Sequence, residues 1–178
     1  DNRTERFQEF KYEGGIASFI KHINENKSVL HESPVYFSGK SDDVEIEVSF
    51  QYNDSYTERI FSFVNNINTI EGGTHLTGFK GALTRTLNNY MTSNKIANDS
   101  KENLSGEDVR EGMAAVISAR VMNPQFESQK KIKLTNVEVK GKVETLVSEY
   151  LGAYLEENPV VAKKIVAKGI DAQRARIA

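Results

Sequence analysis

The feature that most constrains the fold is the segment 63–79, in which a strand passes into a helix through a glycine corner. Apolar and polar residues alternate up to Val64, and a polar turn then leads to Gly72 and Gly73. Glycine reaches backbone angles that a side chain forbids, and Thr74 stands where a helix-capping residue is expected. The segment therefore predicts a strand, a tight turn and a helix that begins at about Thr74.

Alternating apolar and polar residues predict three strands before this corner. The first begins at Val35, the second covers 44–51 and the third covers 58–64, with a turn at residues 53–55 before the third. Because neighbouring strands joined by short turns usually pair, we expect these three to form an antiparallel meander. A fourth strand, rich in small and β-branched residues, is expected over 114–122.

Helical periodicity predicts the remaining elements. A short helix around Ile20 precedes the first strand, and the helix after the corner runs to about residue 94. Ser105, followed three residues later by Asp108, is typical of a short capped helix. The run 135–138 has the form of a capping box and opens a long helix, which ends near Pro159, and a helical pattern then resumes over 160–178. The order of elements predicts an α+β fold, with helices on one face of a mixed four-stranded sheet and a long C-terminal helix.

Composition excludes several classes of site. The 178 residues include no cysteine, so disulfides, thiolate metal sites and cysteine nucleophiles are absent. The formal net charge is only −2, which argues against a surface that binds nucleic acid over its whole extent. No apolar run is long enough to cross a bilayer and no secretory leader is present, so we expect a soluble cytosolic chain without a membrane partner.

Several motifs have a common resemblance. They are the corner of residues 63–79, the entry run Tyr12-Glu-Gly-Gly15, the acidic helix start Ser105-Gly-Glu-Asp-Val-Arg-Glu-Gly-Met113, and Pro124-Gln-Phe-Glu-Ser-Gln-Lys-Lys-Ile-Lys-Leu134. In this order they resemble the second domain of the ATPase subunit of bacterial type II topoisomerases, the family of gyrase and topoisomerase IV, with the gyrase type the nearer match. The resemblance covers nearly the whole chain.

The resemblance implies a fold and a division of the chain. The family's domain has the ribosomal-protein-S5 domain-2-like fold, with a left-handed crossover that no spacing argument predicts. Residues 1–14 would be the end of a preceding GHKL-type ATPase domain or its linker, 15–158 the transducer domain, and 159–178 a helical connection toward the TOPRIM domain.

The basic loop Gln129-Lys130-Lys131 is the candidate nucleotide contact. From the residues alone, such a run is most often a solvated basic loop. In the family, the glutamine and the second basic residue of this loop touch the γ-phosphate of ATP held by the preceding domain. The resemblance thus assigns γ-phosphate contact and catalytic support to Gln129 and Lys131. Lys130 stands where the family usually has threonine, so either lysine could dominate the contact.

Two further groups have competing interpretations. Lys80 and Arg85 lie on the helix after the corner, and charged side chains at such positions are usually just solvated. The resemblance implies instead that they face the cavity through which DNA passes. Glu71 and His75 at the corner supply too few ligands for a metal, so a structural corner, with His75 as a hydrogen-bonding side chain, is the favoured interpretation. We expect no metal site in this chain.

The expected function follows from the resemblance. The chain would couple ATP binding and hydrolysis to DNA strand passage and negative supercoiling, with ATP bound mainly by the preceding domain and Mg²⁺ held outside this chain. Implied partners are the gyrase A subunit, double-stranded DNA and a second copy of the full subunit. The isolated chain should not hydrolyse ATP. The alternatives are the same domain of topoisomerase IV, a nucleic-acid-binding S5-like module without nucleotide sensing, and a structural spacer.

Overall fold

The structure, a computed structural model, describes residues 15–98, 100–127 and 133–178. The described part begins with α2 (Gly15–Ile23) and continues with the strands β1 (Val35–Ser41), β2 (Val44–Tyr52), β3 (Arg59–Val64) and β4 (Ile67–Asn68). Then follow α3 (Thr74–Ser93), α4 (Gly106–Arg110), β5 (Met113–Val121), α5 (Val137–Glu157) and α6 (Pro159–Ile177). The predicted helices and the four longer strands are therefore confirmed within a few residues.

The sheet has five strands in the order β1-β2-β5-β3-β4, so the predicted four-stranded sheet was wrong by one strand. The added strand β4 has only two residues and pairs with β3 across a turn in which Asn65 and Asn66 have φ of 51° and 67°. Asparagine tolerates this left-handed region, which suits a tight hairpin. A two-residue strand has too few positions to show alternation, and the sequence pattern therefore missed it.

The antiparallel meander was also wrong. The last strand, β5, lies between β2 and β3, antiparallel to β2 and parallel to β3. A parallel neighbour needs a long crossover, and α3 with α4 supplies it. All β5 residues except Arg120 are buried, which fits a strand in the middle of the sheet with both faces covered over most of its length.

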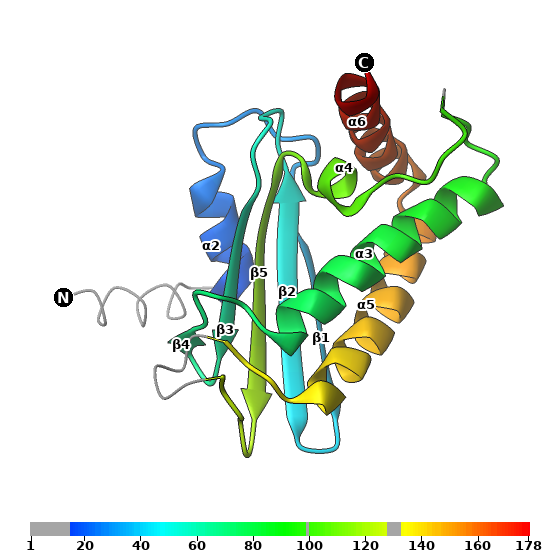
Figure 1. The fold of residues 1–178 in the computed structure, drawn as a ribbon. Helices are drawn as coiled ribbons and strands as arrows, with labels where there is room; N and C mark the ends of the chain where they lie inside the picture. The colour runs from blue at the N-terminus through cyan, green and yellow to red at the C-terminus, as the bar shows by residue number, and fades with distance from the viewer. Residues whose placement is uncertain (1–14, 99, 128–132) are drawn as a thin grey trace.

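Helices cover both faces of the sheet, so their predicted restriction to one face was wrong (Figure 1). On one face α3 and α5 lie side by side and enclose the main core, which includes Val48, Phe50 and Leu83. On the other face α2 buries Phe19 and Ile20 against Phe63 and Val116 in a smaller core. The small apolar stripe of α2 gave no indication of which face it would cover.

The three predicted helix caps differ in outcome. Ser105 and Asp108 form the expected capping box on α4, each side chain accepting from the backbone N–H of the other. At α3 and α5 the N-caps are Gly73 and Asn136, and neither makes a side-chain capping bond. The predicted capping by Thr74 and by the 135–138 run was therefore wrong.

None of the helices described here combines the length and the apolar composition that a membrane-spanning helix needs.

Candidate functional site

The predicted nucleotide contacts Gln129, Lys130 and Lys131 lie outside the described residues. The segments on either side of them are described, and they pair with each other. The backbone N–H of Glu127 donates to the carbonyl of Lys133 at 3.0 Å, and that of Thr135 donates to the carbonyl of Gln125 at 2.7 Å. We call residues 123–127 and 133–136 the loop stem. The described residues on the two sides of segment 128–132 are thereby held against each other.

The glycine corner holds the second strand of the loop stem. The backbone N–H of Leu134 donates to the carbonyl of Gly72, and the N–H of Thr74 donates to the carbonyl of Leu134, both at 3.1 Å. Gly73 lies between these bonds with φ of 136°, and a Cβ there would be 2.5 Å from the backbone N and O of Leu134. Only glycine permits this approach. The start of α3 is thereby bonded directly to the loop stem.

Asn136 holds the base of the loop stem from the other side. Its side chain is 3% exposed, its Oδ1 accepts from the backbone N–H of Gln125 at 2.6 Å, and its Nδ2 donates to the carbonyl of Asn123 at 3.2 Å. The sequence pattern missed this residue because the run from Thr135 to Glu138 imitates a capping box. Its place immediately before the long helix was the signal in the sequence that could have drawn attention to it.

His75 is completely buried one residue inside α3. The Ser62 hydroxyl donates to the carbonyl of Thr69, so the Thr69 hydroxyl donates its hydrogen to the Ser62 oxygen. The Thr69 hydroxyl oxygen then accepts from the Nε2–H of His75 at 3.2 Å. The buried Nδ1 of the same ring has no bonding partner among the described residues. Burial lowers the pKa of His75 to about 4, so the imidazole is neutral. The expectation of a hydrogen-bonded structural histidine is met at one ring nitrogen only.

Lys80 and Arg85 are brought together by the structure. Both line a hollow of about 630 Å³ between α3 and the segment 103–110, together with Thr84, Asn88 and Arg110. Arg110 is paired with Glu58 at 3.1 Å, while its neighbours in the hollow are mainly amides and hydroxyls. The Thr84 hydroxyl and the Asn88 amide donate to backbone carbonyls, so Lys80 and Arg85 are the groups in this hollow that suit contact with phosphate oxygens.

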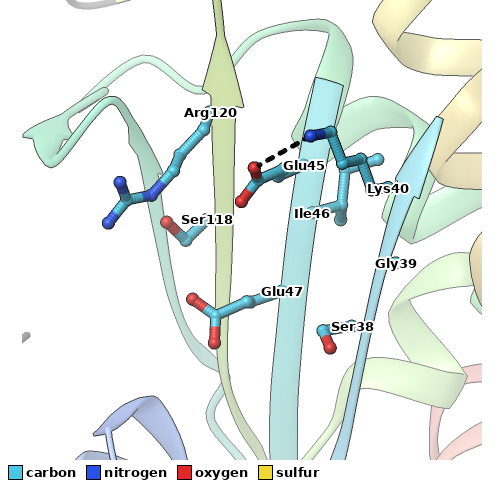
Figure 2. A pocket seen from close by; sticks show the side chains of 8 residues that line it. All are labelled: Ser38, Gly39, Lys40, Glu45, Ile46, Glu47, Ser118 and Arg120. Carbon is cyan, nitrogen blue, oxygen red and sulfur yellow. Dashed lines mark ion pairs between the residues drawn. The ribbon is translucent and has the colours of Figure 1, made fainter. Parts of the chain in front are cut away.

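A second hollow, of about 450 Å³, lies on a part of the sheet that no helix of the described residues covers (Figure 2). Its charged residues have both signs: Lys40 and Glu45 form an ion pair at 3.8 Å, and Glu47 accepts a 2.6 Å hydrogen bond from the hydroxyl of Tyr36. Arg120 projects from β5 at its edge (Figure 2). This balance of charge gives no preference for an anion, and no predicted site residue lies here.

The described residues contain no group of three or more histidine, aspartate or glutamate side chains that could hold a metal ion. Lys133, which follows the basic loop in sequence, is paired with Glu127 across the loop stem at 3.3 Å. Among the described parts, the candidate site therefore consists of the loop stem, the glycine corner that holds it, and the basic hollow on α3.

Comparisons with known proteins agree with one another. The family model described as DNA gyrase B matches residues 15–178. The chain is 54% identical over all its residues to the DNA gyrase B subunit of Myxococcus xanthus, and it covers 22% of that protein.

Solved structures resemble the fold. The 43K ATPase domain of Thermus thermophilus gyrase B superposes with a TM-score of 0.85 at 40% identity, covering 92% of this chain and 44% of that one. The topoisomerase IV ATP-binding domain of Francisella tularensis gives 0.81 at 28% identity, covering 94% of this chain and 44% of that one. The chain thus spans less than half the length of each of these relatives.

Proposed function

The chain belongs to the DNA gyrase B family, and on that premise we propose that it is the transducer domain of the ATP-hydrolysing subunit of a gyrase-type topoisomerase. In this role it senses ATP bound by the preceding domain and couples ATP binding and hydrolysis to DNA strand passage and negative supercoiling. We also assign the sheet to the ribosomal-protein-S5 domain-2-like fold, with α3 and α4 in the crossover between the parallel strands β3 and β5.

The proposed contact is made by Gln129 and Lys131 with the γ-phosphate, and Lys130 adds positive charge beside them. An ammonium group and an amide both donate hydrogen bonds to phosphate oxygens, and a bond to a charged group is the stronger kind. These residues shift the conformation only if they bind the triphosphate state more tightly than the diphosphate state. Bound ATP supplies the phosphate charge that this loop recognises, and Mg²⁺ is assigned to the preceding domain.

The observation that carries the proposal is the bonding of the loop stem to two helices at once. Leu134 is hydrogen bonded to Gly72 and Thr74 at the start of α3, and the stem continues through Asn136 into α5. A displacement of segment 128–132 along the stem therefore acts on the first turns of both helices. This arrangement suits a domain that converts a phosphate contact into a change of domain angle.

Exposed apolar residues near the loop stem indicate that a neighbouring domain packs at this end of the sheet. Ile70 is 76% exposed, Met122 is 71% exposed and Val137 is 79% exposed, and each lies within three residues of the backbone bonds that form or hold the loop stem. Large apolar side chains exposed around the same stem are candidate contacts for a neighbouring domain. We place the preceding ATPase domain, to which residues 1–14 would belong, against this surface.

The remaining assignments follow from the same proposal. Residues 15–158 form the transducer domain, and 159–178 connect it toward the TOPRIM domain. Lys80 and Arg85 contact the backbone of double-stranded DNA, and the partners are the gyrase A subunit and a second copy of the full subunit. The proposed location is the cytoplasm.

A lysine substitution in the intact subunit tests the proposal. Lys131→Ala removes one charge-assisted hydrogen bond, worth about 1.5–3 kcal/mol, so ATP turnover should fall by roughly ten- to a hundredfold with the fold retained. The matched variant is Lys130→Ala, which removes the same charge one residue away and should have the smaller effect. The measurement is steady-state ATP hydrolysis with circular dichroism on both variants. Turnover unchanged in Lys131→Ala would refute the assignment.

A further inference from the structure

Arg110 differs from Lys80 and Arg85, the other cations of the basic hollow on α3, in being paired with Glu58. The pair uses only one end of its guanidinium group. Nε donates to the carboxylate of Glu58, at 3.1 Å from one oxygen and 3.4 Å from the other. Among the described residues, none accepts a hydrogen bond from Nη1 or Nη2 of Arg110. Because a guanidinium group carries most of its N–H donors on these two atoms, Arg110 can still bind a second acceptor.

The Nη end of Arg110 lies at the wall of the hollow. A Cβ added to Gly106 would be 2.6 Å from Nη1 of Arg110 and 3.7 Å from Oγ1 of Thr84. Gly106 and Thr84 both line the hollow, whereas Glu58 is not one of its lining residues. The guanidinium group is therefore held from outside the hollow at Nε and presents its other end to the inside.

Glu58 has two opposite effects on an anion that enters the hollow. The Arg110 side chain is only 14% exposed, and its bond to Glu58 fixes the plane of the fork. A cation that is already held in place loses less conformational entropy on binding, and an oriented fork suits bidentate contact with phosphate oxygens. The negative charge of Glu58 acts in the other direction, because it weakens the attraction between Arg110 and a phosphate.

We propose that Arg110 is a further phosphate-binding residue of the DNA contact in this hollow, that Glu58 positions it, and that the charge of Glu58 limits the strength of the contact. The inference rests on the proposed function, in which Lys80 and Arg85 contact the backbone of double-stranded DNA. The hollow measures about 630 Å³, and its cations come from two helices, α3 and α4. Cations spread over two elements suit the repeated phosphates of a duplex better than one small anion.

The test compares Glu58→Gln with Glu111→Gln in the intact subunit, by fluorescence anisotropy with labelled duplex at several salt concentrations. Each substitution removes one negative charge from an ion pair, since Glu111 is paired with Lys168 at 3.4 Å, and Glu111 does not line the hollow. A glutamine oxygen still accepts from Nε of Arg110, so the fork keeps its orientation. Glu58→Gln should strengthen duplex binding by about two- to fivefold at low salt and make the slope of log affinity against log salt steeper. Glu111→Gln should bind duplex as wild type does.

The complementary variant is Arg110→Gln, which removes the fork itself. It should flatten the same slope by about 1, with a similar loss of affinity on every duplex sequence. Its thermal midpoint shows whether it folds, and if it does not, the comparison of Glu58→Gln with Glu111→Gln decides. Equal duplex binding by these two glutamate variants would overturn the inference, and so would a wild-type slope in folded Arg110→Gln.

Two further measurements separate this inference from the proposed function. The double variant Lys80→Ala/Arg85→Ala is titrated alongside. If it flattens the slope while the Glu58 and Arg110 variants match wild type, the DNA contact stands and the role of Arg110 fails; if no variant changes the slope, both fail. Inorganic phosphate is then added at constant ionic strength. Duplex that stays bound supports the assignment to the DNA backbone, and displaced duplex would show that the hollow binds a free anion instead.

Discussion

At the residue scale, two buried histidines are folded in their neutral form. His31 donates from Nδ1 to the carbonyl of Ser33 at 2.9 Å and accepts at Nε2 from the backbone N–H of Tyr52 at 3.0 Å, so protonation would remove the acceptor that Tyr52 needs. Burial lowers the pKa of His31, and burial lowers that of His75 to about 4. Protonation of either side chain therefore favours the unfolded chain and lowers the stability of the fold.

The chain is expected to lose stability in mild acid for this reason. Between pH 6.5 and about 4, His75 is protonated in the unfolded chain and neutral in the folded chain. The free energy of unfolding therefore has its full value above pH 6.5 and falls as the pH drops toward 4. The gap in pKa corresponds to roughly 3 kcal/mol. Urea unfolding at intervals from pH 7 to 4 should show a shallower loss for His75→Gln than for wild type. An identical loss of stability with pH in wild type and His75→Gln would contradict the prediction.

At the scale of elements, polar contacts join α6 to α4 beside the main core. Arg176 donates to both oxygens of Asp108 at 2.9 and 3.0 Å, and Lys168 is paired with Glu111 at 3.4 Å. Burial alone would raise the pKa of Asp108, but the bonds from Arg176 and Ser105 outweigh it and hold that pKa below its usual value. One carboxylate thus closes the capping box of α4 and binds the last turn of α6.

Loss of this carboxylate should therefore affect two helices. Asp108→Ala removes a cap, worth about 1 kcal/mol, together with the partner of Arg176, and we expect a total destabilisation of about 1–3 kcal/mol in urea unfolding. Hydrogen exchange of α6 amides should accelerate more than that of α5 amides. Lys40→Ala breaks an exposed ion pair instead and should change stability by less than about 0.5 kcal/mol. Equal effects of the two substitutions would contradict the double role.

Periodicity along the chain predicted the elements far better than their arrangement. The helix over 74–93 and the alternation of Val44 to Phe50 depend on local spacing, which the sequence contains. The insertion of β5 between β2 and β3 depends on contacts between strands that are far apart in the sequence, and a local pattern does not determine which strands pair. The same limit hid Asn136, whose partners Asn123 and Gln125 lie across the loop stem. The predicted role of Gln129 and Lys131 came from resemblance, and it remains a prediction.

At the scale of the whole molecule, α3 and α5 join two distant ends of the domain. Both begin at the loop stem and run side by side toward α4 and α6 (Figure 1). They approach so closely that a Cβ on Gly78 would lie 2.7 Å from the carbonyl oxygen of Lys140. At the far end, the amide of Asn88 bonds both the N–H and the carbonyl of Leu104 at 2.9 and 3.0 Å. Packed helices thus connect the loop stem to α4 and α6.

The proposed DNA contact belongs to this scale because it depends on the outer face of α3 in the assembled subunit. If Lys80 and Arg85 each neutralise one phosphate, the double variant Lys80→Ala/Arg85→Ala should flatten the slope of log affinity against log salt by about 2 for duplex DNA. Its affinity should fall by a similar factor on every sequence, because backbone contacts do not read bases. Lys21→Ala/Lys27→Ala removes two exposed charges near α2, across the sheet from α3, and corrects for the change in net charge. Fluorescence anisotropy of the intact subunit with labelled duplex, titrated at several salt concentrations, measures both slopes. Equal slopes for the two double variants would mean that the hollow on α3 attracts DNA only through net charge, and the direct contact would be abandoned.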